Sequence, residues 1–124
     1  MKAPILLPAL VCAAGLLSSA GVVHPQERAA APAEFAACAV CHSTDGSEGT
    51  GPTLKGVVGR TSGSAAGFRY SRAMRVAAIT WDAGTLDRYL VDPQALVPGN
   101  VMPFAGVEDA AARARIVAWL VALR

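Results

Sequence analysis

The sequence predicts an all-α domain, and three observations carry this prediction. The C-terminal stretch VEDAAARARIVAWLVALR (107–124) places apolar residues at helical spacing. The stretch DAGTLDRYLV (82–91) starts with a good N-capping residue and ends before Asp92-Pro93, a pair that stops helices. No stretch shows the convincing apolar–polar alternation of a strand. At 124 residues the chain has room for one domain.

Residues 1–20 are expected to be a signal peptide for export. Lys2 precedes an uncharged apolar stretch that includes Cys12, and Ser18-Ser19-Ala20 offers small residues for cleavage there or a few residues later. Export predicts a periplasmic protein. The alternative is an uncleaved membrane anchor, because the uncharged run is just long enough to span a bilayer.

Residues 21–32, rich in Ala and with two prolines, are expected to form a tether before a domain at 33–124. Of 11 Lys and Arg in the chain, one lies in the signal peptide, which leaves ten against nine Asp and Glu. A near-neutral domain does not indicate a nucleic-acid partner. So small a domain often needs a disulfide, a metal or a similar group to stabilise it. The cysteines left for a disulfide are Cys38 and Cys41.

The central motif is FAACAVCHSTDG (35–46), which places His42 directly after two cysteines three residues apart. A short helix is expected to lead into Cys38, with Pro32 in its first turn. A zinc site needs about four ligands, and the other histidine, His24, lies in the tether, so zinc binding is not favoured. A thioredoxin-like redox pair should follow a strand, which is absent here, and a structural disulfide would not need His42.

Covalent haem attachment accounts for the whole motif. Both thiols form thioethers with the vinyl groups, and the adjacent imidazole becomes an axial iron ligand. The porphyrin also supplies the apolar plate that a small core lacks. One haem c bound through Cys38 and Cys41, with His42 as an iron ligand, is the favoured interpretation.

The second axial ligand is expected to be Met102. It lies in VPGNVMPFAG, a stiff loop of prolines and glycines that can present one side chain at a fixed position. The alternative for Met102 is core packing. Met74, in YSRAMRVAAI, is interpreted as core filler, although it is a conceivable rival ligand.

These features together resemble the small class I cytochromes c, particularly the mitochondrial and bacterial cytochrome c2-like branch. The resemblance extends from about Phe35 to Leu123. Beyond the attachment motif it rests on GTGPTLKGVVGR (49–60), GFRYS (67–71), ITWD (79–82), TLDRYLVDPQALVPG (85–99), MPFAG (102–106) and IVAWL (116–120). It implies a class I cytochrome c fold, with a few helices wrapped around one covalently attached haem.

The resemblance also implies the surroundings of the two axial ligands. The Pro52 carbonyl is expected to accept the Nδ1 proton of His42, which orients the imidazole and raises its basicity. The Tyr89 hydroxyl is expected to reach the sulfur of Met102, although packing of the core would also explain an aromatic residue there.

A buried haem propionate is expected to be hydrogen-bonded or neutralised by Arg60, Tyr70 and Trp81, because an unpaired carboxylate inside a protein is costly. Asn100 replaces the usual threonine and can still donate to a propionate. Met74 replaces an asparagine of the mitochondrial relatives, and its thioether cannot donate a hydrogen bond.

The function that the resemblance implies is a soluble, monomeric electron shuttle rather than an enzyme. A membrane quinol–cytochrome c oxidoreductase or a dehydrogenase would act upstream, and a terminal oxidase, peroxidase or photosynthetic centre downstream. The alternatives are a haem enzyme or gas sensor with a labile sixth ligand, and an electron-relay subunit of a larger oxidoreductase. The lysine-rich face of the mitochondrial relatives is replaced at Ala37, Gln94, Ala95 and Val101, which predicts docking through apolar contact.

Overall fold

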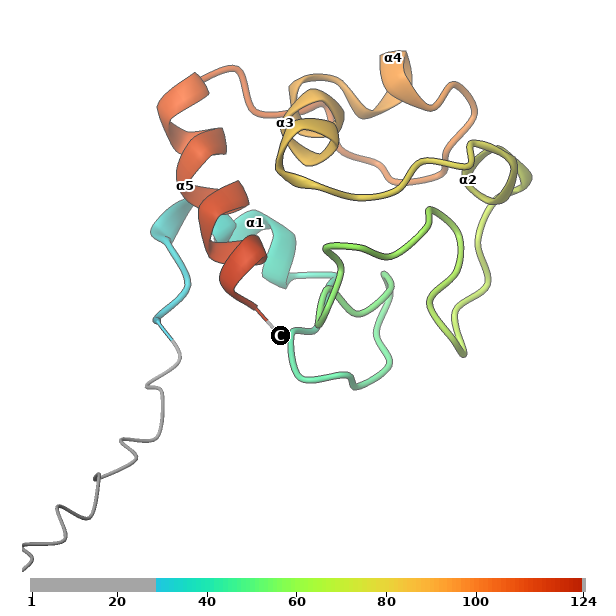
Figure 1. The fold of residues 1–124 in the computed structure, drawn as a ribbon, viewed down its shortest axis with the longest axis horizontal. Coiled ribbons are helices and arrows are strands. Elements are labelled where there is room, and N and C mark those ends of the chain that lie inside the picture. Colours follow the sequence, from blue (N-terminus) through green and yellow to red (C-terminus); the bar gives the residue numbers. More distant parts are fainter. Residues whose placement is uncertain (1–28, 124) are drawn as a thin grey trace, which may run out of the picture.

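The computed structural model describes residues 29–123. The expected signal peptide and residues 21–28 of the expected tether lie outside the described residues. The elements are the 3-10 helix η1 (Ala33–Phe35) and the helices α1 (Ala36–Ala39), α2 (Arg72–Val76), α3 (Ala83–Val91), α4 (Pro93–Leu96) and α5 (Ala110–Ala122). Figure 1 shows them joined by long irregular segments. Residues 29–123 contain no strand, only an isolated bridge between Thr61 and Thr80, so the all-α prediction is confirmed.

Helix α5 forms where the C-terminal amphipathic stretch predicts it. The Asp109 carboxylate caps it by accepting hydrogen bonds from the backbone N–H groups of Ala111 and Ala112. Ile116 and Leu120 are buried in the core on one face of the helix. Trp119 is half-buried, and the centroid of its ring lies 4.6 Å from that of Phe35.

Helix α3 is also confirmed, with the expected cap. The Asp82 carboxylate accepts a hydrogen bond from the Thr85 N–H, and the Thr85 hydroxyl accepts one from the Asp82 N–H. The two residues therefore form a capping box. Asp92-Pro93 ends α3, but it also starts α4, which was not predicted. The Asp92 side chain accepts from two backbone N–H groups of α4, and Pro93 occupies its first position.

The expected short helix before the cysteines is formed by η1 and α1 together. Pro32 lies at the N-cap of η1 rather than within the first turn. Helix α2 was not predicted, and it begins where the Ser71 hydroxyl accepts from the Met74 N–H.

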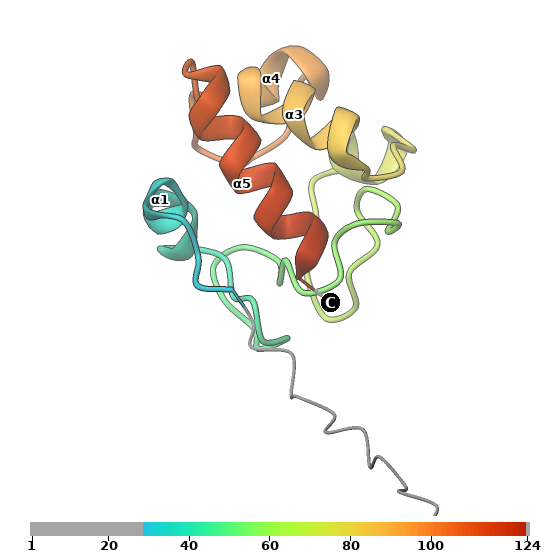
Figure 2. The ribbon, with the colours of Figure 1, turned by 60° about the vertical axis from the view of Figure 1, so that its left-hand side comes forward.

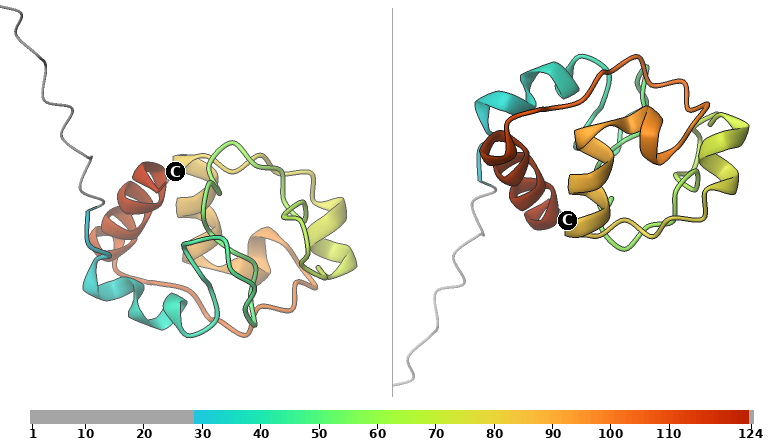
Figure 3. Two further views of the ribbon diagram at one scale, coloured as in Figure 1. Left: turned by 90° about the horizontal axis from the view of Figure 1, so that it is seen from below. Right: turned by 90° about the horizontal axis from the view of Figure 1, so that it is seen from above.

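The helices lie around a common centre, as the views from below and above show (Figure 3). Helix α5 packs against η1 and α3 (Figure 2). Helix α2 lies on the far side from α5, α4 packs against α3, and the irregular segment 40–70 closes one end (Figure 1). Between residues 29 and 123, no helix has the length and apolar character needed to cross a membrane.

Candidate haem-binding site

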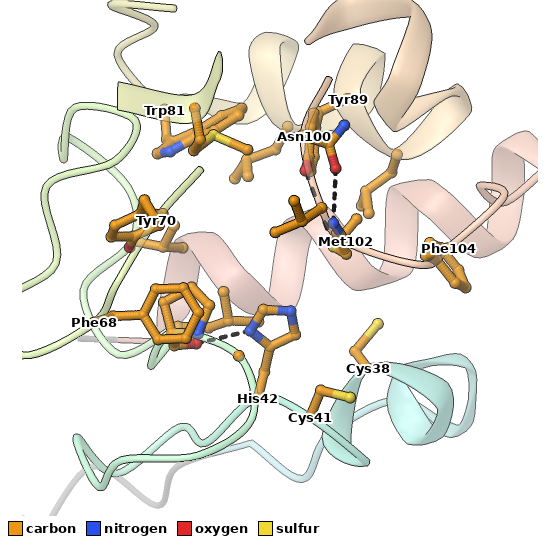
Figure 4. Close-up of a pocket in the computed structure, with 18 of the residues that line it drawn as sticks. Cys38, Cys41, His42, Phe68, Tyr70, Trp81, Tyr89, Asn100, Met102 and Phe104 are labelled. Atoms are coloured by element: carbon orange, nitrogen blue, oxygen red, sulfur yellow. Dashed lines mark hydrogen bonds between the residues drawn. The ribbon is translucent and has the colours of Figure 1, made fainter. Parts of the chain in front are cut away.

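A cavity of about 440 Å³ opens at the centre of the fold. Its wall is largely apolar, and the apolar residues that line it include Phe35, Leu54, Val57, Leu86, Ile116 and Leu120. They come from the N-terminal helices, the irregular segment, α3 and α5. The chemistry-bearing residues expected from the sequence lie on the same wall (Figure 4).

The motif residues are presented to the cavity by a single helical turn. The backbone N–H groups of Cys41 and His42 both donate to the Cys38 carbonyl, at 3.1 and 2.9 Å. This turn directs two thiols and an imidazole toward the same cavity (Figure 4). Cys38 and Cys41 are both free thiols, so the disulfide interpretation does not hold in this structure. Burial raises the pKa of the Cys38 thiol.

The His42 ring is held by a backbone carbonyl. Its Nδ1 lies 2.7 Å from the Pro52 oxygen. A carbonyl oxygen can only accept, so Nδ1 carries the ring proton and the Nε2 lone pair is left free for a metal. This is the contact that the resemblance implies for Pro52.

Gly51 is a site residue that was not predicted from the sequence. A Cβ atom at this position would lie 2.8 Å from both Cε1 and Nδ1 of His42. Only glycine therefore lets the chain pass beside the imidazole and bring the Pro52 carbonyl to it. The signal was present in the sequence as the glycine before Pro52, in GTGPT.

Met102 faces His42 from the opposite side of the cavity (Figure 4). The Tyr89 hydroxyl donates to the Met102 sulfur at 4.0 Å. Tyr89 is buried on α3, and desolvation raises the pKa of its hydroxyl to about 12. The hydroxyl therefore remains a neutral donor at physiological pH.

Three of the residues expected to contact a propionate lie together on the wall: Arg60, Tyr70 and Trp81. The Arg60 guanidinium donates to the carbonyls of Thr53 at 2.7 Å and Lys55 at 3.2 Å, which fixes its plane. Trp81 is buried, and its ring centroid lies 5.1 Å from that of Tyr89. The aromatic ring of Tyr70 lies edge-on to Phe68, with centroids 4.8 Å apart.

Asn100 is placed differently from the expectation. Its Nδ2 donates to the carbonyls of Pro93 at 2.8 Å and Val97 at 3.0 Å, so both amide hydrogens are engaged within the protein. Its Oδ1 accepts from the Met102 N–H at 3.0 Å. The amide therefore has no free donor for a propionate, and it binds the loop that bears Met102 instead.

Met74 lies on α2 and lines the same cavity. Its side chain is half-buried and packs against the core, as expected for a core filler. The cavity wall thus contains two thioethers, of which Met102 is the one contacted by the Tyr89 hydroxyl.

These residues fit a covalently attached haem. The largely apolar wall suits a porphyrin face, and the two thiols on one turn suit two thioether bonds at one edge of the ring. The imidazole has its Nε2 free, and a thioether stands across from it. A small all-α domain with this arrangement belongs to the c-type haem proteins.

Comparison with known proteins identifies the family. A family model described as Cytochrome c matches residues 27–124, so the chain belongs to the cytochrome c family. It is 45% identical over 94 residues to cytochrome c2 iso-2 of Magnetospirillum fulvum, covering 75% of this chain and 98% of that protein. It is 47% identical over 85 residues to cytochrome c of Chlamydomonas reinhardtii, covering 67% of this chain and 76% of that one.

The fold agrees with a solved relative. The structure of cytochrome cH from Methylobacterium extorquens superposes with a TM-score of 0.68 at 42% identity, over 71% of this chain and 90% of that one. The predicted class I cytochrome c fold is thus confirmed. The chain carries haem c covalently bound through Cys38 and Cys41, and it is a haem-based electron-transfer protein rather than an enzyme.

Proposed function

We propose that this cytochrome is a periplasmic shuttle for single electrons, with His42 and Met102 as the axial ligands of its haem iron. The observation that carries the proposal is the placement of the two side chains. Imidazole and thioether enter one largely apolar cavity from opposite sides (Figure 4).

The protein contributes orientation and electrostatics to this function. When bound, the haem takes up and releases one electron at its iron, and thioether ligation in apolar surroundings favours the reduced form. Pro52 holds the imidazole in the required tautomer, and Tyr89 donates to the sulfur. With His42 and Met102 both bound to the iron, small molecules would be kept from the metal.

Arg60, Tyr70 and Trp81 are proposed to hold a haem propionate. All three residues line the cavity and carry polar groups, and the Arg60 guanidinium is already oriented by two backbone carbonyls. Each donor stabilises a buried carboxylate that would otherwise be costly. Asn100 is not included in this set, because both of its amide hydrogens are engaged elsewhere.

The proposed location follows from the N-terminal sequence. Residues 1–20 would direct export and residues 21–32 would form a tether before the domain at 33–124. The similarity to bacterial cytochromes c2 supports a periplasmic site of action. Mass spectrometry of the mature chain locates the N-terminus and separates a cleaved signal peptide from an anchor.

The proposed partners are proteins of respiratory or photosynthetic electron transfer. A quinol–cytochrome c oxidoreductase or dehydrogenase would reduce the protein, and a terminal oxidase, peroxidase or photosynthetic centre would oxidise it. A monomer suits such exchange, because each partner must bind and release the carrier quickly.

The test is an absorption spectrum of both redox states, with Met102→Ala beside the wild type. Methionine ligation predicts a weak far-red sulfur-to-iron charge-transfer band in the oxidised wild type, and its loss in the variant. A wild-type spectrum without this band would overturn the ligand assignment.

Carbon monoxide separates the shuttle from the sensor alternative. The reduced wild type is expected not to bind carbon monoxide at neutral pH, whereas Met102→Ala binds it. Fast stoichiometric binding by the wild type would favour a gas sensor. Co-purification with a larger oxidoreductase would favour the relay subunit, with the same haem site.

A further inference from the structure

We propose that Asn100 and Gln94 are positioning residues, whose side-chain amides hold Met102 in the cavity. The proposal rests on the axial role of Met102 given above. It concerns the segment 97–102, which connects the end of α4 to that ligand.

Backbone hydrogen bonds alone fix this segment poorly. The Asn100 N–H donates to the Val97 carbonyl at 3.1 Å, and the next described backbone bond that ties the chain to a helix is from Val107 to Leu90. Gly99 adopts a φ of +85°, which turns the chain sharply after α4. The chain that carries Met102 therefore depends on other contacts.

Asn100 supplies three of those contacts at once. Its Nδ2 donates to the Pro93 and Val97 carbonyls, and its Oδ1 accepts from the Met102 N–H. The orientation of the amide is unambiguous, since carbonyls only accept and the N–H only donates. Asn100 is 6% exposed, and Pro93 and Val97 are buried as well, so the amide links Met102 to a rigid frame.

Gln94 acts on the same segment from outside. Its Nε2 donates to the Asn100 carbonyl at 2.9 Å, and its Oε1 accepts from the Gly99 N–H at 3.3 Å. This exposed side chain therefore binds the backbone on both sides of the Gly99–Asn100 peptide bond. We call Gln94 and Asn100 together the amide clamp.

A threonine at position 100 could not replace the clamp, because its hydroxyl has one hydrogen to donate where Asn100 donates two. The loss of an amide should therefore loosen the Met102 loop before it affects α3 or α5. An external ligand that competes with Met102 would then bind more tightly.

The test uses N100A, N100T and Q94A, with S62A as the matched control. Ser62 is buried and its hydroxyl accepts from the Ile79 N–H at 3.1 Å, so S62A removes a side chain-to-backbone bond that does not touch the Met102 loop. Imidazole is titrated into each oxidised protein while the far-red band is followed. Hydrogen exchange of the Gly99 and Met102 amides is measured in the reduced proteins.

The affinity for imidazole is expected to increase about tenfold in N100A, less in N100T, and about threefold in Q94A. These increases correspond to the stabilisation of the Met102 loop that is lost with hydrogen bonds of ordinary strength. S62A should bind imidazole as the wild type does. Exchange of the Met102 amide should accelerate in N100A, and that of the Gly99 amide in Q94A, by more than exchange of α5 amides. Because Gln94 is exposed, Q94A keeps the test valid if N100A does not fold.

Two failures are distinguishable. If the wild type shows the far-red band but Q94A and the folded Asn100 variants bind imidazole like S62A, the amide clamp is wrong and Met102 ligation stands. If the wild type lacks the band, the ligand assignment itself is wrong. The exchange rates still report on the clamp in that case, and unchanged rates in the variants would overturn it.

Discussion

Arg115 of α5 and Glu34 of η1 form a salt bridge between residues 81 positions apart, with Arg115 Nε 2.8 Å from Glu34 Oε1. The contact joins the C-terminal helix to the start of the domain. Hydrogen bonding to this guanidinium lowers the pKa of the Glu34 carboxyl. Because both groups are solvent-accessible, water and salt screen the pair, and its contribution to stability at neutral pH is small.

The thermal midpoint should fall in acid. The pKa values of Asp82 and Asp109 are lowered from 3.8 by hydrogen bonds from the first turns of their helices, and that of Glu34 is lowered from 4.5. A carboxyl with a depressed folded-state pKa stabilises the fold above its unfolded-state pKa, and this stabilisation is lost as the pH falls through the folded-state value. These groups should leave the midpoint flat from pH 7 to about 5 and lower it below about pH 4, as followed by circular dichroism.

The matched variant is E34Q/D82N/D109N. Asparagine still caps a helix but does not titrate, so α3 and α5 should persist at neutral pH. Its loss of stability in acid, relative to its own value at pH 7, should be shallower than in the wild type. An equally steep acid limb would assign the acid sensitivity to other groups.

Replacing Gly51 with alanine should disturb His42. The added Cβ would lie 2.8 Å from two ring atoms, so the imidazole or the backbone must move. Overpacking of this kind costs about 1–3 kcal/mol in the free energy of unfolding. Denaturant unfolding measures this cost, and the absorption spectrum reports the altered axial ligand.

G84A is the control for that experiment. Gly84 lies in α3, and its added Cβ would meet only the Asp82 carboxylate at an ordinary 3.5 Å. Alanine there should stabilise the helix by up to about 1 kcal/mol. Equal stability of G51A and the wild type would mean that the ring has more freedom than the structure gives it.

The elements that sequence patterns could predict are those with enough turns to show a period. The C-terminal helix has four apolar residues on one face, and α3 has both a cap and a stop signal. Helices α2 and α4 contain five and four residues, too few to show a period, and their serine and aspartate caps resemble ordinary turn residues. The pair Asp92-Pro93 predicts the end of one helix. In the structure the same pair also begins the next helix, which the sequence pattern alone does not reveal.

The candidate site likewise contains residues that a local motif reveals and residues whose contacts only the structure reveals. Cys38, Cys41 and His42 lie within five consecutive residues, so the attachment motif could be recognised without a structure. The contacts of Gly51, Gln94 and Asn100 depend on the path of irregular loops, which no local pattern determines. Asn100 shows the limit most clearly, since its residue type suits a propionate contact but both of its amide hydrogens bind backbone carbonyls instead.

Replacing Tyr89 with phenylalanine should change the electronic environment of the Met102 sulfur while preserving the core. The hydroxyl donates to the sulfur at 4.0 Å, and the ring is otherwise retained. Without this donor the sulfur becomes a better electron donor to the oxidised iron, so the far-red band should shift and the reduction potential should fall by on the order of tens of millivolts. Y70F, which changes a hydroxyl that does not contact the sulfur, should leave the band in place. An unshifted band in Y89F would contradict the contact.

Docking to a redox partner should depend little on salt. Four of the positions that the resemblance matches to lysines of the mitochondrial relatives are exposed and uncharged here, namely Ala37, Gln94, Ala95 and Val101. Uncharged contacts provide little electrostatic steering, so the rate of reduction by a purified quinol–cytochrome c oxidoreductase, measured by stopped flow, should vary weakly with ionic strength. The variant A37K/A95K should acquire a steeper dependence. A steep dependence in the wild type would show that other charges guide the encounter.

The central cavity also determines the order in which the protein can be assembled. Without the prosthetic group, the largely apolar wall of the cavity of about 440 Å³ would face water instead of a porphyrin, and the chain would lose that burial from a stability that is small in any domain of this size. The polypeptide without its prosthetic group should therefore not reach this shape. Attachment of the haem at Cys38 and Cys41 is therefore expected before the chain completes its folding.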